Sequence, residues 1–428
     1  MLQGNKIKFD YVVSGTGMLR LNSKKLFHEQ PEFIKNKNAV NNAGILYLKE
    51  YINTTYPLFD LSISALYNAY VEPHLGEHHV EHHKDTFDGI YADSGGLQVI
   101  TCGAQLTEEL KTEVYKKQDM SDFSFCFDEI PVDRLHPTSG DIKYRVFNPS
   151  IAKQKAQETA RNVKVQIETL QHSKVMYIVQ GNTIDDMVKW MDDGIEVLGV
   201  ENLHKLGGIA VSIACMGNGE LESIDCVVAC KIILDKYPQI TKRLHLLGFG
   251  ASRKLLPAFV LMNSGFLKDV ILTADSTSQS MAFMMGHAKS IKKPNTRNKE
   301  LIHKNSYREF FTTFEDFYRR YVPDLCIEEL VQLMYDNNRS IGSVEEELYN
   351  DPTHKYYSIC ASIVPLYGLW NIVPMIDSSC KMIDELYHNV YYGLLFNVKT
   401  VEEYNQWRSA NYSKIRNNRV RRKRKTLF

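Results

Sequence analysis

The sequence predicts an α/β fold, a (β/α)8 barrel, from two observations. Short apolar runs that end in polar or glycine-rich tips alternate with segments of helical apolar spacing, and this alternation is typical of parallel βαβ units. Polar tips also follow many successive runs, and in a closed barrel the carboxyl ends of all strands open on one face, which carries the chemistry. A doubly wound open sheet is the alternative, but it would gather such residues at one crevice. We therefore expect the barrel.

The first expected strand is the apolar run at residues 9–13, which a Ser-Gly-Thr-Gly turn follows. The third glycine of a dinucleotide-binding fingerprint is missing, so we interpret this turn as a strand end. Residues 21–70 contain basic and Asn-rich loops and an apolar piece at 45–51. We assign no strand within them.

The later expected strands share one form, an apolar run with a polar or glycine-rich tip. They cover residues 88–92 with Asp93 at the tip, 123–127 with Asp128, 175–179 with Gln180, 205–211 with Ser212, 244–247 with Gly248, and 269–274 with Asp275. Helical apolar spacing separates several of them, at 151–170, 184–198 and 253–264. In a barrel these tips would converge.

The chain changes character after the last of these strands. Residues 289–304 are basic and polar, and aromatic-rich segments with helical spacing follow at 307–321, 327–335, 344–349, 356–370 and 383–396. Aromatic residues at helical spacing usually belong to a core. We therefore divide the chain into a barrel at 1–288, a helical region at 289–412 and a basic tail at 413–428.

Composition indicates an ordinary globular protein. The 428 residues are 44% hydrophobic and 24% charged. No apolar run is long enough for a transmembrane helix, and the first ten residues lack the apolar segment of a signal peptide. The eight cysteines have no framework spacing, which is typical of reduced thiols. We expect a cytoplasmic protein without membrane contact.

The C-terminal tail is strongly basic. Residues 413–428 hold eight basic and no acidic side chains, whereas the formal net charge of the chain is zero. Such a segment favours binding to a phosphate backbone with salt-dependent, sequence-independent affinity. A solubilising terminus is the simpler alternative.

A histidine cluster at residues 74–83 raises the question of a metal site. His78 and His82, and likewise His79 and His83, would share a helix face if the segment is helical, with Glu77 nearby. A solvated histidine-rich helix explains the same pattern, and the sequence reveals no further ligands. We prefer this simpler interpretation.

The tip after residues 88–92 has the most distinctive composition. Asp93 is followed by Ser94, Gly95 and Gly96. A carboxylate and a hydroxyl beside two residues without Cβ atoms would let a flat ligand lie close to the backbone. A plain strand-to-turn junction is the alternative for this stretch taken alone.

The tips taken together resemble the queuine/archaeosine tRNA-guanine transglycosylase family. That family is a (β/α)8 barrel that exchanges a guanine for a 7-deazaguanine. The resemblance covers roughly residues 88–276 and rests on the order and spacing of the motifs at 93–98, 127–129, 179–181, 207–211, 247–250 and 274–276.

The resemblance implies a role for each matched residue. Asp275 would be the nucleophile that attacks the sugar C1′ and expels guanine, and Asp93 the general acid/base. The purine would be held by residues at the other tips: Asp128, Gln180, the backbone of Gly208 and Ile209, and the turn at Ser94, Gly95 and Gly96. The chemistry agrees, because a carboxylate can carry a covalent glycosyl intermediate while a second carboxylate moves protons.

Three departures from the family pattern change the expected substrate. Leu97 stands where the tRNA enzymes usually have an aromatic residue. Ile213 stands where members that take an aminomethyl base carry a glutamate, so a neutral substituent, as in 7-cyano-7-deazaguanine, is expected. The Cys-x-Cys-x-x-Cys zinc cluster that should follow Asp275 is not recognisable, so no cofactor is assigned.

The chain keeps the catalytic residues of the family but not the motif of the tRNA-docking region. In this combination it resembles the DNA-guanine transglycosylases of phage and bacterial 7-deazaguanine DNA modification. The resemblance implies a pentosyltransferase whose partners are DNA and a 7-deazaguanine base, which protects phage DNA from host restriction in the cytoplasm of a host cell. A divergent tRNA-guanine transglycosylase, with tRNA as partner, is the first alternative. The others are a metal-dependent barrel hydrolase that uses residues 74–83 and a non-catalytic nucleic-acid binder.

Overall fold

The structure is a computed structural model. It describes residues 5–14, 31–70, 80, 84, 86–95, 107–134, 145–212, 220–249, 252–276, 299–337, 344, 347–348, 351–389 and 393–425.

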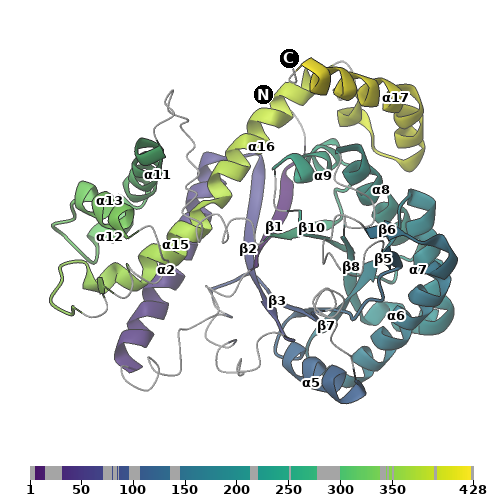
Figure 1. Cartoon of the computed structure of the whole chain (residues 1–428), viewed down its shortest axis with the longest axis horizontal. Coiled ribbons are helices and arrows are strands. Elements are labelled where there is room, and N and C mark those ends of the chain that lie inside the picture. Colours follow the sequence, from purple (N-terminus) through teal and green to yellow (C-terminus); the bar gives the residue numbers. More distant parts are fainter. Residues whose placement is uncertain are drawn as a thin grey trace.

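Parallel strands close into a barrel within these residues (Figure 1). The eight strands are β1 (Ile7–Ser14), β2 (Phe59–Asn68), β3 (Ile90–Asp93), β4 (Phe123–Phe125), β7 (Lys174–Val179), β8 (Leu206–Ser212), β9 (Arg243–Leu247) and β10 (Ile271–Ser276). Each pairs in parallel with its neighbours, and β1 closes the ring by pairing with both β2 and β10. The predicted (β/α)8 barrel is therefore confirmed.

Helices follow the strands and form an outer layer. They are α2 (Pro31–Thr55), α5 (Glu108–Gln118), α6 (Pro149–Thr169), α7 (Ile184–Leu198), α8 (Glu220–Lys236) and α9 (Ser252–Ser264), with the 3-10 turn η2 (Val200–Lys205) before β8. Local signals fix their starts: the Thr183 side chain accepts from the Asp186 amide at the start of α7, and Asn148 caps α6 before a proline. The helices predicted at 151–170, 184–198 and 253–264 are confirmed as α6, α7 and α9.

One excursion interrupts the alternation between β4 and α6. There, β5 (Val132–Arg134) and β6 (Arg145–Phe147) form a two-stranded antiparallel sheet. The expected strand at 9–13 is confirmed as β1, whereas the unassigned residues 21–70 contain α2 and β2. The apolar piece at 45–51 lies inside α2.

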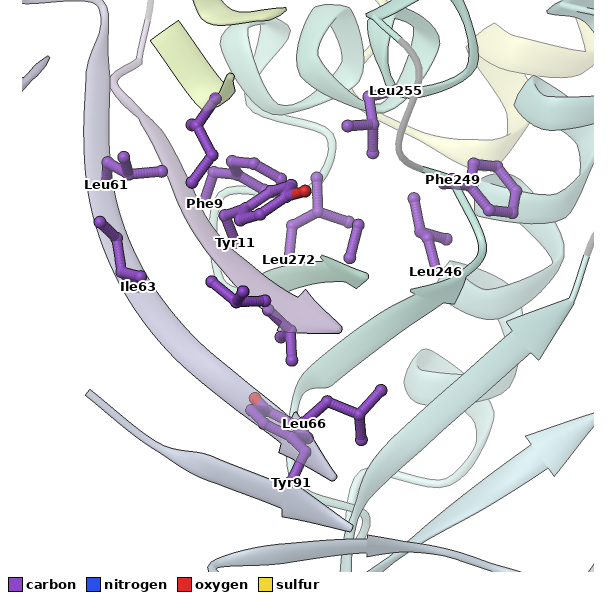
Figure 2. Packing of buried hydrophobic residues seen from close by; sticks show 14 of the residues in the cluster. Phe9, Tyr11, Leu61, Ile63, Leu66, Tyr91, Leu246, Phe249, Leu255 and Leu272 are labelled. Atoms are coloured by element: carbon purple, nitrogen blue, oxygen red, sulfur yellow. The ribbon is translucent and has the colours of Figure 1, made fainter. Parts of the chain in front are cut away.

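Aromatic side chains join the strands to the helical layer. Phe9 of β1 and Phe59 of β2 each meet Phe259 of α9 edge-on, with ring centroids 5.0 and 5.1 Å apart. These residues belong to the buried cluster drawn in part in Figure 2, with Leu272 of β10 close to Phe9. This layer stabilises the barrel wall from outside.

The amino-terminal half of the barrel interior is filled by a polar and aromatic plug. Arg243 donates to the Tyr91 hydroxyl at 2.6 Å, and its guanidinium lies 4.2 Å from the ring centre of Phe123. The Tyr91 hydroxyl in turn donates to Asp10 at 3.2 Å. The barrel is therefore packed below its strand ends, as in other barrels of this type.

The C-terminal region is helical and aromatic-rich, as predicted. It comprises α11 (Lys299–Thr313), α12 (Glu315–Arg319), α13 (Ile327–Asp336), α15 (Tyr357–Trp370), α16 (Ile372–Tyr387), the 3-10 turn η3 (Gly393–Asn397) and α17 (Val401–Lys425). These helices pack on the outer layer of the barrel: α15 on α2, α16 and η3 on α9, and α17 on α8 (Figure 1). The expected basic tail from residue 413 continues α17 as far as Lys425.

No helix in the described part of the chain has both the length and the apolar character to cross a bilayer.

Candidate active site

Carboxylates from separate strands meet at the carboxyl ends of the barrel. Asp93 ends β3, Asp275 is the last residue but one of β10, and Asp128 follows β4 by three residues. Because parallel strands close into a barrel, these strand ends open on one face, as predicted. Burial raises the pKa of both Asp93 and Asp128, and the charge of Asp275 at Asp93 and that of Asp93 at Asp128 add to the rise.

Asp93 is a partly buried carboxyl with a perturbed pKa. Asn68 at the end of β2 donates to its Oδ2 at 2.9 Å, and the Gly95 amide donates to its Oδ1 at 3.3 Å. Burial raises the pKa of Asp93 to about 6, against the lowering effect of the Gly95 amide, and the nearby Asp275 charge adds to the rise. Such a group can release and accept a proton near neutral pH.

The turn after Asp93 depends on glycine. Gly95 has a positive φ of 78°, and a Cβ atom added there would lie 2.5 Å from the Cβ of Tyr70. Ser94 is buried, and its hydroxyl donates to the Cys126 carbonyl at 3.0 Å. That contact ties the end of β3 to β4. Gly96, the other predicted member of this turn, lies outside the described residues.

Asp128 and Gln180 form a hydrogen-bonded pair just past the ends of the adjacent strands β4 and β7. The buried Gln180 side chain donates to Asp128 Oδ2 at 2.6 Å. Burial raises the pKa of Asp128 to about 7, although the Gln180 donor lowers it. A carboxyl and a carboxamide side by side can offer both donors and acceptors to a flat polar ligand.

Asp275 is held through one of its two oxygens. Its Oδ1 accepts from the Gly248 amide at 2.9 Å and lies 3.2 Å from Nε2 of His245. The second oxygen, Oδ2, has no hydrogen bond to any part of the chain that the structure describes. His245 is fully buried, and its other ring nitrogen lies 2.7 Å from the hydroxyl of Thr273.

Two residues of the site, His245 and Asn68, are not among the sequence-predicted ones. His245 lies inside an apolar run, but Arg243 and His245 alternate with leucines in β9 and so share the face that points into the barrel. Asn68 ends β2, a strand that the sequence pattern does not predict. In both cases the signal is a polar residue on one face, or at the end, of an apolar run.

Gly208 and Ile209 lie within β8 and not at its end. Gly208 pairs with Met176 of β7, four residues before Gln180, whereas Ser212 at the end of β8 lies beside Leu247. The contact of their backbone with a purine stays a prediction. An added Cβ at Gly208 would lie 2.5 Å from the Arg243 carbonyl oxygen, so close packing of β8 on β9 explains the glycine.

Within the described residues, no group of three or more His, Cys, Asp or Glu side chains is arranged to hold a metal ion. Most of the histidine cluster at 74–83 and the stretch after β10 at 277–298 lie outside those residues. The described part of the site contains the three carboxyl groups of Asp93, Asp128 and Asp275.

Comparisons with known proteins add little. No family model and no curated protein matches the chain. A mutant of the O-GlcNAc hydrolase of Thermobaculum terrenum has a similar solved structure, with 11% identity, a TM-score of 0.31, and coverage of 88% of this chain and 86% of that one. Similarity at this level carries no argument about function.

Proposed function

We propose that the protein is a DNA-guanine transglycosylase, a pentosyltransferase that exchanges guanine in DNA for a 7-deazaguanine. The observation that carries the proposal is the presence of two unlike carboxyl groups at the carboxyl-end rim of the barrel, Asp93 at the end of β3 and Asp275 at the end of β10. Asp275 is fixed through Oδ1 by the Gly248 amide, while the pKa of Asp93 is raised to about 6. One group is arranged as a nucleophile and the other as a proton carrier.

The first half of the exchange makes a covalent intermediate on Asp275. A lone pair of Oδ2 forms a bond to C1′ of the nucleotide as the C1′–N9 bond breaks, and the electrons of that bond pass to the purine. Asp93 in its protonated form gives the leaving purine a proton. Retaining glycosidases use the same division of labour between two carboxyl groups.

The second half reverses these steps with another base. N9 of the 7-deazaguanine attacks C1′, the C1′–Oδ2 bond breaks, and its electrons return to the Asp275 carboxylate. The N9 proton passes to Asp93, which is thereby ready for the next cycle. A raised pKa suits this double duty, because the group must both donate and accept near neutral pH.

Asp128 and Gln180 are assigned to the edge of the purine. Guanine presents an amide-like oxygen and several N–H donors, and this pair offers a carboxamide donor and a carboxyl acceptor in contact with each other. The incoming base is proposed to be 7-cyano-7-deazaguanine, because Ile213 supplies no charge for an aminomethyl group.

The proposal of DNA as the polymer rests on the sequence and on the attachment of the basic segment, residues 413–428, to the barrel through α17. No zinc cluster of the tRNA enzymes is recognisable after Asp275, and residues 413–428 carry eight basic side chains. The structure joins most of this segment to α17, whose residue Arg408 pairs with Asp225 of α8 at 2.9 and 3.0 Å. A basic segment mounted on the barrel can contact phosphates while the target guanosine is flipped toward the site. Such an exchange would protect phage DNA from host restriction.

The deciding experiment is guanine exchange on two polymers. Duplex DNA and tRNA, each carrying radiolabelled guanine, are incubated with the protein and 7-cyano-7-deazaguanine, and label release is followed. The proposal expects release from DNA and a covalent protein–DNA adduct on a denaturing gel. Release from tRNA alone would assign the enzyme to the tRNA branch, and release from neither would refute the proposed reaction.

A further inference from the structure

Asp275, the proposed nucleophile, is connected to the barrel interior through the side chains of His245 and Thr273. Thr273 and Asp275 are both on β10 and face the same way, two residues apart, and His245 on the adjacent strand β9 lies between them. The histidine ring is 2.7 Å from the Thr273 hydroxyl on one side and 3.2 Å from Asp275 on the other. No step of the proposed exchange requires this histidine to touch the substrate.

The surroundings of His245 leave its ring no other position. The side chain is fully buried, and its ring centre lies 4.6 Å from that of Phe125 and 5.7 Å from that of Tyr91. A fully buried ring packed against two aromatic side chains cannot swing away from Asp275 without opening the core. Its two nitrogens are therefore fixed toward Thr273 and Asp275.

The partners of the ring indicate which nitrogen carries the proton. Nε2 lies 3.2 Å from Oδ1 of Asp275, and an ionised carboxylate, the form that attacks the sugar in the proposed exchange, can only accept a hydrogen bond. Nε2 therefore carries the proton, and Nδ1 of the neutral imidazole then accepts from the Thr273 hydroxyl at 2.7 Å.

We infer that His245 is a positioning residue of the proposed transglycosylation: held by Thr273 in its Nε2–H form, it donates to Oδ1 of Asp275 and thereby directs Oδ2 to the sugar. The inference rests on the proposed function for its catalytic consequence. The His245 and Gly248 donors bind the free carboxylate most strongly, because its negative charge is largest when no sugar is attached. They therefore stabilise the charge that returns to Asp275 as the C1′–Oδ2 bond breaks.

A matched pair of variants separates this role from simple packing. His245→Gln places an amide N–H at about the depth of Nε2, whereas His245→Met fills a similar volume without a donor. We expect the Gln variant to keep most of the exchange activity and the Met variant to lose about 100-fold, as for other lost donors to a developing charge. The Met variant should also accumulate the covalent adduct, because breakdown of the intermediate slows more than its formation.

Two outcomes would overturn the inference. Equal losses in the Gln and Met variants, without adduct accumulation, would mean that the histidine only packs. The ring tautomer of His245 in the full-length protein gives a substrate-independent test, measured by 15N NMR and assigned by loss of the signal in His245→Gln. A proton on Nδ1 would refute the inference whatever the reaction. A proton on Nε2 in an enzyme without exchange activity would leave the positioning of Asp275 supported and would refute the proposed function alone.

Discussion

Asp93→Asn should make the protein more stable while it abolishes exchange. Burial raises the pKa of Asp93 from an ordinary value of 3.8 to about 6, so the folded state holds the proton more tightly than the unfolded chain between these two pH values. The native protein therefore loses stability as the pH rises through this window, and above it the loss is constant. The gap corresponds to roughly 3 kcal/mol.

An asparagine carries no such penalty, but it gives up one acceptor. The Tyr70 amide fixes the orientation of Asn68 by donating to its Oδ1 at 3.0 Å, so Asn68 continues to present its N–H to residue 93. The new amide can then accept from Asn68 but not also from the Gly95 amide, a loss of about 1 kcal/mol. The net gain above pH 7 is about 2 kcal/mol, which for a chain of 428 residues is a rise of about 2 °C in melting temperature.

Thermal unfolding of both proteins at pH 4, 6 and 8 measures this gain. The difference in melting temperature should be near zero or negative at pH 4 and positive at pH 8. Asp60→Asn, an exposed position on β2, is the matched control and should show no such trend. A difference between Asp93→Asn and the native protein that does not change with pH would refute the reasoning.

The other predictions concern the reaction and its polymer. Asp275→Asn should abolish both label release and the covalent adduct, whereas Asp60→Asn should retain both; residual adduct in the former would remove the assigned nucleophile. Gln180→Met should weaken binding of 7-cyano-7-deazaguanine about tenfold through the lost amide donor, as measured by calorimetry, and unchanged affinity would exclude Gln180 from the base site. Asp225→Asn removes the charged partner of Arg408 and should loosen α17 from α8, so that proteolysis near the C-terminus becomes faster. An unchanged cleavage pattern would show that this ion pair is not needed to hold α17. Deletion of residues 413–428 should weaken DNA binding and flatten its salt dependence, and an identical salt slope would show that this segment does not contact phosphate.

The sequence contains enough information for the barrel and for the carboxylates at its rim. Asp93 and Asp275 each end a short apolar run, so the alternation of strands and helices is sufficient to place them on one face. The pairing of His245 with Asp275 could not be predicted in the same way, because the two residues belong to different strands and their contact depends on register. Strand spacing alone leaves that register open.

The same limit applies to the position of Gly208. Its motif has the right order along the chain, but order does not determine how far a strand extends past its neighbour. Pairing with Met176 places the glycine deep in the barrel wall. The perturbed pKa values of Asp93 and Asp128 likewise depend on burial by segments distant in sequence, which no local pattern reports.

The contact between α2 and the C-terminal helices links the two ends of the chain. Tyr47 of α2 donates to the Thr313 carbonyl at 3.0 Å and its ring lies 5.2 Å from that of Phe314, while Tyr51 lies 5.9 Å from Trp370. During synthesis, α2 emerges from the ribosome long before the residues that cover it. Its aromatic face must therefore wait exposed until about 320 further residues have been added, as the positions of Tyr51 and Trp370 require. A chain cut after the last barrel strand would keep that face exposed permanently. We therefore expect the barrel to need the helical region on the same chain in order to fold without aggregating.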